Sequence, residues 1–319
     1  MNRKRLLATF AATAAVTGGA AATASAATVE QQAAVSQNWA GYVAGGTQFS
    51  SVSGSWVQPA AKCGSGQTYS AFWVGIGGSS NQSAALEQTG TQADCTAGGG
   101  TEYYAWYELV PAAPVKLDLA IKPGDHISAK VSVSGSNVTV SLSDQTTGQS
   151  TTKTLQMDNP DTSSAEWIAE APSACDGSGS CQTLPLAEFG TVQFTSATAT
   201  ANGHTGTISD PNWSAQPVQL GGSGLSDVSY GSGTGSSGAS PSSLSSDGSS
   251  FSVAAQASSA STGAAGRAGG YGYGDGGYGY GGYPGGGYGY GGYPGDGYGQ
   301  YGYGGGGYGY GYGDGYGLF

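Results

Sequence analysis

Residues 126–142 have the sequence HISAKVSVSGSNVTVSL, in which apolar and polar side chains alternate on both sides of a short polar break. Strict alternation is typical of β-strands that bury one face. The break, Ser134-Gly135-Ser136, consists of turn residues that join antiparallel strands in a hairpin. This stretch therefore predicts two adjacent antiparallel strands.

The same periodicity extends from residue 36 to about residue 220, and no long run of apolar residues at helical spacing interrupts it. Further turn sequences occur at residues 122–125 and 144–148. Many short strands within one domain predict an all-β sandwich or barrel. The expected strands are 38–43, 52–57, 69–76, 84–89, 102–110, 115–121, 126–133, 137–142, 165–171 and 191–196.

The first 26 residues have the features of a signal peptide. A basic start with Arg3, Lys4 and Arg5 precedes an apolar stretch that ends in Ala24-Ser25-Ala26, a small-residue cleavage site. We expect cleavage after Ala26 and secretion, with 27–35 as a short N-terminal segment before a domain at 36–220. No other stretch approaches the roughly 20 apolar residues of a membrane-spanning helix, so no membrane insertion is expected.

The C-terminal part has a different composition. Residues 221–270 are rich in Gly, Ser and Ala and predict a linker, and residues 271–319 repeat Gly and Tyr and carry 15 of the 21 tyrosines. Such segments bury too little apolar surface to offset the entropy of ordering their glycines, which predicts disorder. The tail is expected to be either a flexible extension that self-associates weakly or an adhesive segment that binds a cell wall.

Charge narrows the range of partners. Removal of residues 1–26 leaves six basic against twenty acidic residues, a net charge of −14. Nucleic acids and anionic membranes are bound through clustered positive charge, so neither is an expected partner.

The four cysteines of an exported chain are expected to form two disulfides. Of the three possible connectivities we favour Cys63–Cys95 together with Cys175–Cys181, since the latter closes a small polar loop. A zinc site would need two close pairs of ligands and only one is present, so no metal and no cofactor are expected.

The alternation also assigns residues to strand faces. Phe72, Val74 and Ile76 share one face, as a core would, whereas Tyr69, Ala71 and Trp73 share the other, whose two large aromatics do not suit a simple solvated surface. The same rule groups Tyr104, Trp106 and Glu108, places Leu86 with Gln88, and groups Glu166, Ile168 and Glu170. If these strands are neighbours, aromatic and acidic side chains line one groove, which suits an extended polymer, either polypeptide or polysaccharide.

Several established catalytic arrangements are absent from the sequence. His126 and His204 are its two histidines, and neither a G-x-S-x-G nor an H-E-x-x-H motif occurs. A serine triad and a zinc peptidase are therefore disfavoured, and the Asp-Thr/Ser-Gly signature of aspartic peptidases is also missing.

Six short segments between residue 36 and about residue 200 combine tryptophans, glycines, glutamines and glutamates in a fixed order. The segments are 36–41 (SQNWAG), 71–76 (AFWVGI), 86–90 (LEQTG), 104–108 (YAWYE), 146–149 (TTGQ) and 165–170 (AEWIAE). No single segment is specific, but taken in series, with their order and spacing, they resemble the glutamic peptidase (eqolisin) family.

The resemblance implies a two-sheet antiparallel β-sandwich of the legume-lectin and glucanase (concanavalin-like) type. It also implies that Gln88 and Glu170 are catalytic and that Trp73 and Glu108 line the active site. We add Trp39 and Trp106, from matching segments, as substrate-binding residues. The expected enzyme is a monomeric acid endopeptidase that acts on polypeptides and is insensitive to pepstatin.

Two positions depart from the family pattern, since Gly77 and Tyr104 stand where family members can carry acidic residues. These differences bear on substrate preference.

The alternative function is a carbohydrate-active or carbohydrate-binding sandwich, in which Glu108 and Glu170 would be the paired carboxylates of a retaining glycosidase.

Overall fold

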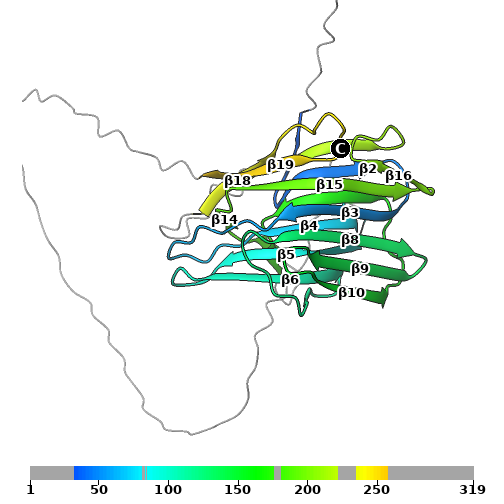
Figure 1. The fold of residues 1–319 in the computed structure, drawn as a ribbon. Helices are drawn as coiled ribbons and strands as arrows, with labels where there is room; N and C mark the ends of the chain where they lie inside the picture. Colours follow the sequence, from blue (N-terminus) through cyan, green and yellow to red (C-terminus); the bar gives the residue numbers. More distant parts are fainter. Residues whose placement is uncertain (1–31, 81–82, 84, 176–180, 222–234, 258–319) are drawn as a thin grey trace, which may run out of the picture. The chain divides into compact units, whose positions relative to one another are not determined.

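The computed structural model describes residues 32–80, 83, 85–175, 181–221 and 235–257, and all regular structure in this part of the chain is β-strand (Figure 1). None of these residues forms a helix that could cross a membrane. Two antiparallel layers, which we call the front sheet and the back sheet, contain most of the strands.

The front sheet has the pairing order β6–β5–β4–β11–β2–β17, and every neighbouring pair in this order is antiparallel. Short strand β7 pairs with β6, and β1 runs parallel to β17. The strands are β1 (Ala34–Ser36), β2 (Trp39–Gly45), β4 (Ala71–Gly77), β5 (Leu86–Cys95), β6 (Thr101–Val110), β7 (Val115–Lys116), β11 (Ser164–Glu170) and β17 (Ser214–Leu220).

The back sheet has the pairing order β10–β9–β8–β3–β15, and the far edge of β15 is shared by β16 and β19. β19 continues to β18 and β18 to β14, while Leu220 of β17 pairs with Ala239 of β18 and links the two sheets. The strands are β3 (Phe49–Val57), β8 (His126–Ser134), β9 (Asn137–Asp144), β10 (Gln149–Gln156), β14 (Leu186–Ala187), β15 (Thr191–Ala201), β16 (His204–Thr207), β18 (Gly235–Pro241) and β19 (Phe251–Ala257).

The main core lies between these sheets and contains the side chains that alternation assigned to it. Phe72, Val74 and Ile76 of β4 are fully buried in the largest hydrophobic cluster. Two tryptophans connect the layers: Trp56 Nε1 donates to Thr91 Oγ1 at 3.0 Å, and Trp167 Nε1 donates to the carbonyl of Ser53 at 2.8 Å. The opposite face of the front sheet is therefore left for the site.

The expected hairpin at 126–142 is confirmed as β8 and β9, joined at Gly135. The strand expected at 115–121 is wrong in extent, because only Val115 and Lys116 pair with β6.

The predicted linker at 221–270 also needs correction. Strands β18 and β19 lie inside this range and pack into the domain, where Phe251 stacks on Phe194 with ring centroids 5.1 Å apart.

One of the two expected disulfides is present, between Cys63 and Cys95, and it ties the chain before β4 to the end of β5. Cys181 is also disulfide-bonded, and the register of the β12 (Ser173–Cys175) and β13 (Cys181–Thr183) ribbon places Cys175 opposite it. The Cys175–Cys181 bridge itself stays a prediction. The signal peptide, the loop 176–180 and the Gly/Tyr segment 271–319 lie outside the described residues.

Candidate active site on the front sheet

The face of the front sheet that points away from the main core carries a second cluster of polar and aromatic side chains, here called the site face. It is organised as rows of residues that are paired across β2, β11, β4, β5 and β6. The first row is Trp39, Glu170, Ala71, Gln92 and Tyr104. The second is Gly41, Ile168, Trp73, Gly90 and Trp106, and the third is Val43, Glu166, Gly75, Gln88 and Glu108.

Glu170 is held by one hydrogen bond to each carboxyl oxygen. Trp73 Nε1 donates to Oε2 at 2.7 Å, and Asn38 Nδ2 donates to Oε1 at 3.0 Å. The side chain is only 7% exposed, and burial raises the pKa of Glu170 to about 7 although these hydrogen bonds oppose the rise. The carboxyl is thus fixed in position and ionises close to neutrality.

Gln88 and Glu108 form a second fixed pair, on neighbouring strands. Gln88 Nε2 donates to Glu108 Oε2 at 2.7 Å, and the amide oxygen of Gln88 is buried without a hydrogen-bond partner. Burial, followed by the negative charge of Glu170, raises the pKa of Glu108 to about 8, and the bond from Gln88 lowers it in part. The influence of Glu170 on Glu108 means that both pairs belong to one electrostatic site.

Trp73 lies between the two pairs because the neighbouring strand positions are glycines. A Cβ atom at Gly75 would be 2.8 Å from Cζ3 of Trp73 and 3.3 Å from Cβ of Gln88. A Cβ atom at Gly90 would be 2.6 Å from Cβ of Trp73. The indole thus reaches Glu170 with its Nε1 edge and lies against the Gln88 row with its other edge.

Apolar side chains surround these polar groups. Trp39 packs edge-on against Trp73 with ring centroids 5.1 Å apart, and Tyr104 packs against the same cluster. The buried members are Trp39, Val43, Ala71, Trp73, Leu86, Trp106, Val110, Ile168 and Val218.

All six residues expected at the site from the sequence therefore lie on one face: Gln88, Glu170, Trp39, Trp73, Trp106 and Glu108. Asn38 lies in the segment 36–41 but was not expected at the site, because alternation does not reveal that its amide bonds to a carboxyl 132 residues away. Gln92, which shares the first row with Glu170, was not expected there either.

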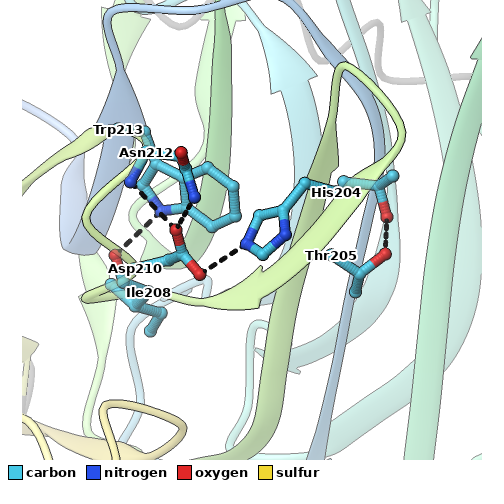
Figure 2. Close-up of polar contacts among 7 residues, drawn as sticks. His204, Thr205, Ile208, Asp210, Asn212 and Trp213 are labelled. Carbon is cyan, nitrogen blue, oxygen red and sulfur yellow. Dashed lines mark hydrogen bonds and ion pairs between the residues drawn. The ribbon is translucent and has the colours of Figure 1, made fainter.

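Neither histidine lies on the site face. His126 begins β8, and His204 begins β16, both in the back sheet. Figure 2 shows His204 beside Asp210, with Nε2 2.8 Å from Oδ2, while Asp210 also accepts hydrogen bonds from Asn212. Among the residues that the structure describes, no group of three or more His, Cys, Asp or Glu side chains could hold a metal ion.

Comparisons with known proteins agree on one family. The sequence profile of the peptidase A4 family matches residues 37–237. Scytalidopepsin B of Scytalidium lignicola is 34% identical over 187 residues, which cover 56% of this chain and 70% of that protein. Aspergillopepsin-2 of Aspergillus niger is 33% identical over 219 residues, which cover 61% of this chain and 74% of that protein.

A solved structure supports the fold. The crystal structure of scytalido-glutamic peptidase with a transition state analog inhibitor superposes with a TM-score of 0.56 at 28% identity, covering 69% of this chain and 98% of that one.

Proposed function

This chain belongs to the peptidase A4 family, the glutamic peptidases or eqolisins, and on that premise we propose that it is a secreted endopeptidase in which Glu170 and Gln88 hydrolyse peptide bonds. The observation that carries this proposal is the fixed carboxyl of Glu170 on the same face as the Gln88 amide. The carbohydrate-active alternative is not adopted, because the matched family and relatives are peptidases.

Glu170 is proposed as the general base. In its ionised form it takes a proton from a water molecule, which then attacks the carbonyl carbon of the scissile bond. The same carboxyl then gives that proton to the nitrogen of the leaving amine as the C–N bond breaks. Hydrogen bonds from Trp73 and Asn38 keep its oxygens in place through both steps.

Gln88 is proposed to stabilise the tetrahedral intermediate. A primary amide has two N–H donors, and only one of them is used for Glu108. The second is available for the negatively charged oxygen of the intermediate, while the unpaired Oε1 can accept a hydrogen bond from the attacking water. Because an amide does not titrate, this role persists in acid.

The acidic optimum that we propose is carried over from the resemblance to the glutamic peptidases. Two groups shape the pH profile: activity rises with pH as Glu170 ionises, and it falls when Glu108 ionises, because a second negative charge then opposes the developing oxyanion. In the substrate-free chain their pKa values are about 7 and about 8, so an optimum in acid requires that the pKa values of both groups be lower once the substrate is bound. Pepstatin, which targets paired catalytic aspartates, is not expected to inhibit.

The test is hydrolysis of unfolded casein by the purified chain from about pH 2 to about pH 8, with and without pepstatin. Glu170→Gln and Gln88→Ala should each lower kcat by at least about 100-fold while thermal unfolding and circular dichroism stay close to the parent. Pepstatin-resistant cleavage that disappears in both variants supports the mechanism. Absence of cleavage across the range, or full activity of Glu170→Gln, would refute it.

Export is proposed from the sequence alone. The secreted product should begin at Ala27, and N-terminal sequencing of protein from the culture medium tests this. A product that retains Met1 would contradict it.

A further inference from the structure

The side-chain amide of Asn38 has two chemically different ends, and one of them meets Glu170. Asn38 is 2% exposed, and its Nδ2 donates to Glu170 Oε1 at 3.0 Å. The carbonyl end of the same amide would repel an ionised carboxylate, whereas it would accept a hydrogen bond from a protonated one. The orientation of the Asn38 amide therefore decides which protonation state of Glu170 it favours.

Ser36 fixes this orientation with its hydroxyl group. Its Oγ accepts hydrogen bonds from the backbone N–H groups of Asn38 at 3.4 Å and Trp39 at 3.1 Å. Because these two contacts use the lone pairs of the oxygen, its hydrogen is directed to Asn38 Oδ1, at 3.3 Å. An amide that accepts from Ser36 at Oδ1 presents Nδ2 to Glu170.

The main chain around this contact is held by hydrogen bonds to neighbouring segments. β1, which ends at Ser36, runs parallel to β17, and the N–H of Gly221 donates to the carbonyl of Ser36 at 3.0 Å. The N–H of Ala171, the residue after Glu170, donates to the carbonyl of Asn38 at 2.9 Å. The backbone thus fixes the positions of Ser36 and Asn38 relative to the Glu170 carboxyl.

We propose, as an extension of the proposed peptidase function on which it rests, that Ser36 is a positioning residue: its hydroxyl orients the Asn38 amide, which holds the Glu170 carboxyl as a proton acceptor. Both oxygens of this carboxyl then face N–H donors, because Trp73 Nε1 donates to Oε2. A carboxylate that accepts two such bonds stays ionised at lower pH than one that accepts a single bond. Ser36 therefore extends the candidate active site to strand β1.

The ionisable groups around Glu170 are left in place when Ser36 is replaced. Within the described strands β1, β2, β4 and β17, no residue on the site face is ionisable. On β6, the charge of Glu170 acts on Glu108. The remaining ionisable residues of this face are Asp94 on β5, Glu102 and Tyr104 on β6, Lys116 on β7 and Glu166 on β11. A shifted pH profile in a Ser36 variant is therefore assigned to the contact with Asn38.

The test compares kcat and KM of the wild type, Ser36→Ala and Asn38→Ala on one peptide from about pH 2 to about pH 8. At the optimum, we expect kcat to fall about 3- to 10-fold in Ser36→Ala and at least about 10-fold in Asn38→Ala, with KM within about twofold of the wild type. The acid limb of the kcat profile should move to higher pH by about half a unit to one unit. An unchanged acid limb, or a loss confined to KM, overturns the inference.

A double-mutant cycle tests whether Ser36 acts through Asn38. If it does, adding Ser36→Ala to Asn38→Ala lowers kcat no further, whereas additive losses overturn the inference. Val35→Ala is the matched control on β1, since this side chain is 57% exposed, and it should leave kcat and the pH profile unchanged. A change as large as that of Ser36→Ala would assign the effect to the docking of β1 and refute the role of the hydroxyl.

The two proposals fail in distinguishable ways. If the wild type cleaves no peptide, the peptidase function itself fails. If the wild type is active, Glu170→Gln is inactive and Ser36→Ala matches the wild type in kcat and pH profile, only the role of Ser36 fails.

Discussion

At the scale of single residues, the site depends on small side chains as much as on the polar groups. Glu170 is oriented by Trp73, and Trp73 can lie in its position only because Gly75 has no side chain. The sequence contains many glycines, so the importance of this one is not visible without the neighbouring strands.

The substitution Gly75→Ala should therefore damage catalysis more than folding. Its methyl group would be 2.8 Å from Trp73 and 3.1 Å from Leu86, so the indole must shift and loosen its bond to Glu170. We expect kcat to fall about 10- to 100-fold and stability to fall by about 1–3 kcal/mol. Peptide hydrolysis and thermal unfolding measure the two effects.

Gly45→Ala on β2 is the matched control, since the only atom within 4 Å of its added Cβ, the Ser163 carbonyl oxygen, lies 4.0 Å away. It should leave kcat unchanged. Wild-type kcat in Gly75→Ala would show that the position of Trp73 does not govern Glu170.

At the scale of strands, the domain extends further along the chain than its composition suggests. β18 and β19 complete the edge of the back sheet next to β15, and Tyr42 of the front sheet donates its hydroxyl to the carbonyl of Ser242 between them. Phe251 and Val253 are buried in the main core. The sequence 235–241 is rich in Gly and Ser and has no apolar alternation, so it does not resemble a strand.

Two truncations test this extension. A chain that ends at Ala257 should keep the stability and activity of the full chain. One that ends at Gly221 loses the buried Phe251 ring, which also contacts Tyr42 with centroids 4.7 Å apart, and should lose at least about 3 kcal/mol. Urea unfolding of both truncations gives the comparison; equal stability of the two would contradict the role of β18 and β19.

The Cys63–Cys95 disulfide also holds elements of the domain together. It joins the segment before β4 to the end of β5, the strand that carries Gln88. It spans 32 residues, and closing a loop of that length is expected to stabilise the fold by about 3–4 kcal/mol. Replacement of both cysteines by alanine should lower the free energy of unfolding by that amount in urea titrations. A loss below about 1 kcal/mol would show that the segment is held by its packing instead.

At the scale of the whole molecule, the fold is suited to acid. Glu87, Asp94, Glu108, Glu166 and Glu170 all have pKa values raised by burial. Each binds a proton more tightly in the folded chain than in the unfolded one. Their contribution to stability is therefore complete below the pKa values of the unfolded chain, near 4, and it is lost as pH rises toward 7–8.

Two aspartates, Asp247 and Asp210, have the opposite effect on stability, and they act below about pH 4. Hydrogen bonds from Ser245 and Ser249 lower the pKa of Asp247 to about 2, and the bond from His204 lowers that of Asp210 (Figure 2). Their stabilisation is lost as pH falls below the ordinary aspartate pKa of about 4. The two trends place maximal stability near pH 4.

The melting temperature should consequently decline from about pH 4 to about pH 8, with each buried acid contributing up to about 1.4 kcal/mol per pH unit. Glu166→Gln removes one of these acids at the same size, so its decline should be shallower. Differential scanning fluorimetry of both proteins across this range tests the expectation. A melting temperature that rises with pH, or identical slopes, would contradict it.

The sequence by itself determined the all-β class, the core face of β4, and the side of its own strand on which each of Trp73, Gln88, Glu108 and Glu170 lies, because alternation within a strand is a local property of the chain. It did not reveal β10, whose sequence QSTTKTLQ is largely polar. Within the part of the chain that the structure describes, this strand pairs only with β9, and hydroxyl pairs such as Thr139 with Thr154 join the two.

Tertiary structure alone decided which strands are neighbours. The strand register places Glu170 opposite Ala71 and Gln88 opposite Glu108. The fold also brings the Asn38 amide to the Glu170 carboxyl and adds β18 and β19 to the back sheet. These contacts join residues far apart in the chain, and their free energy comes from burial and hydrogen bonding that exist only once both sheets have formed.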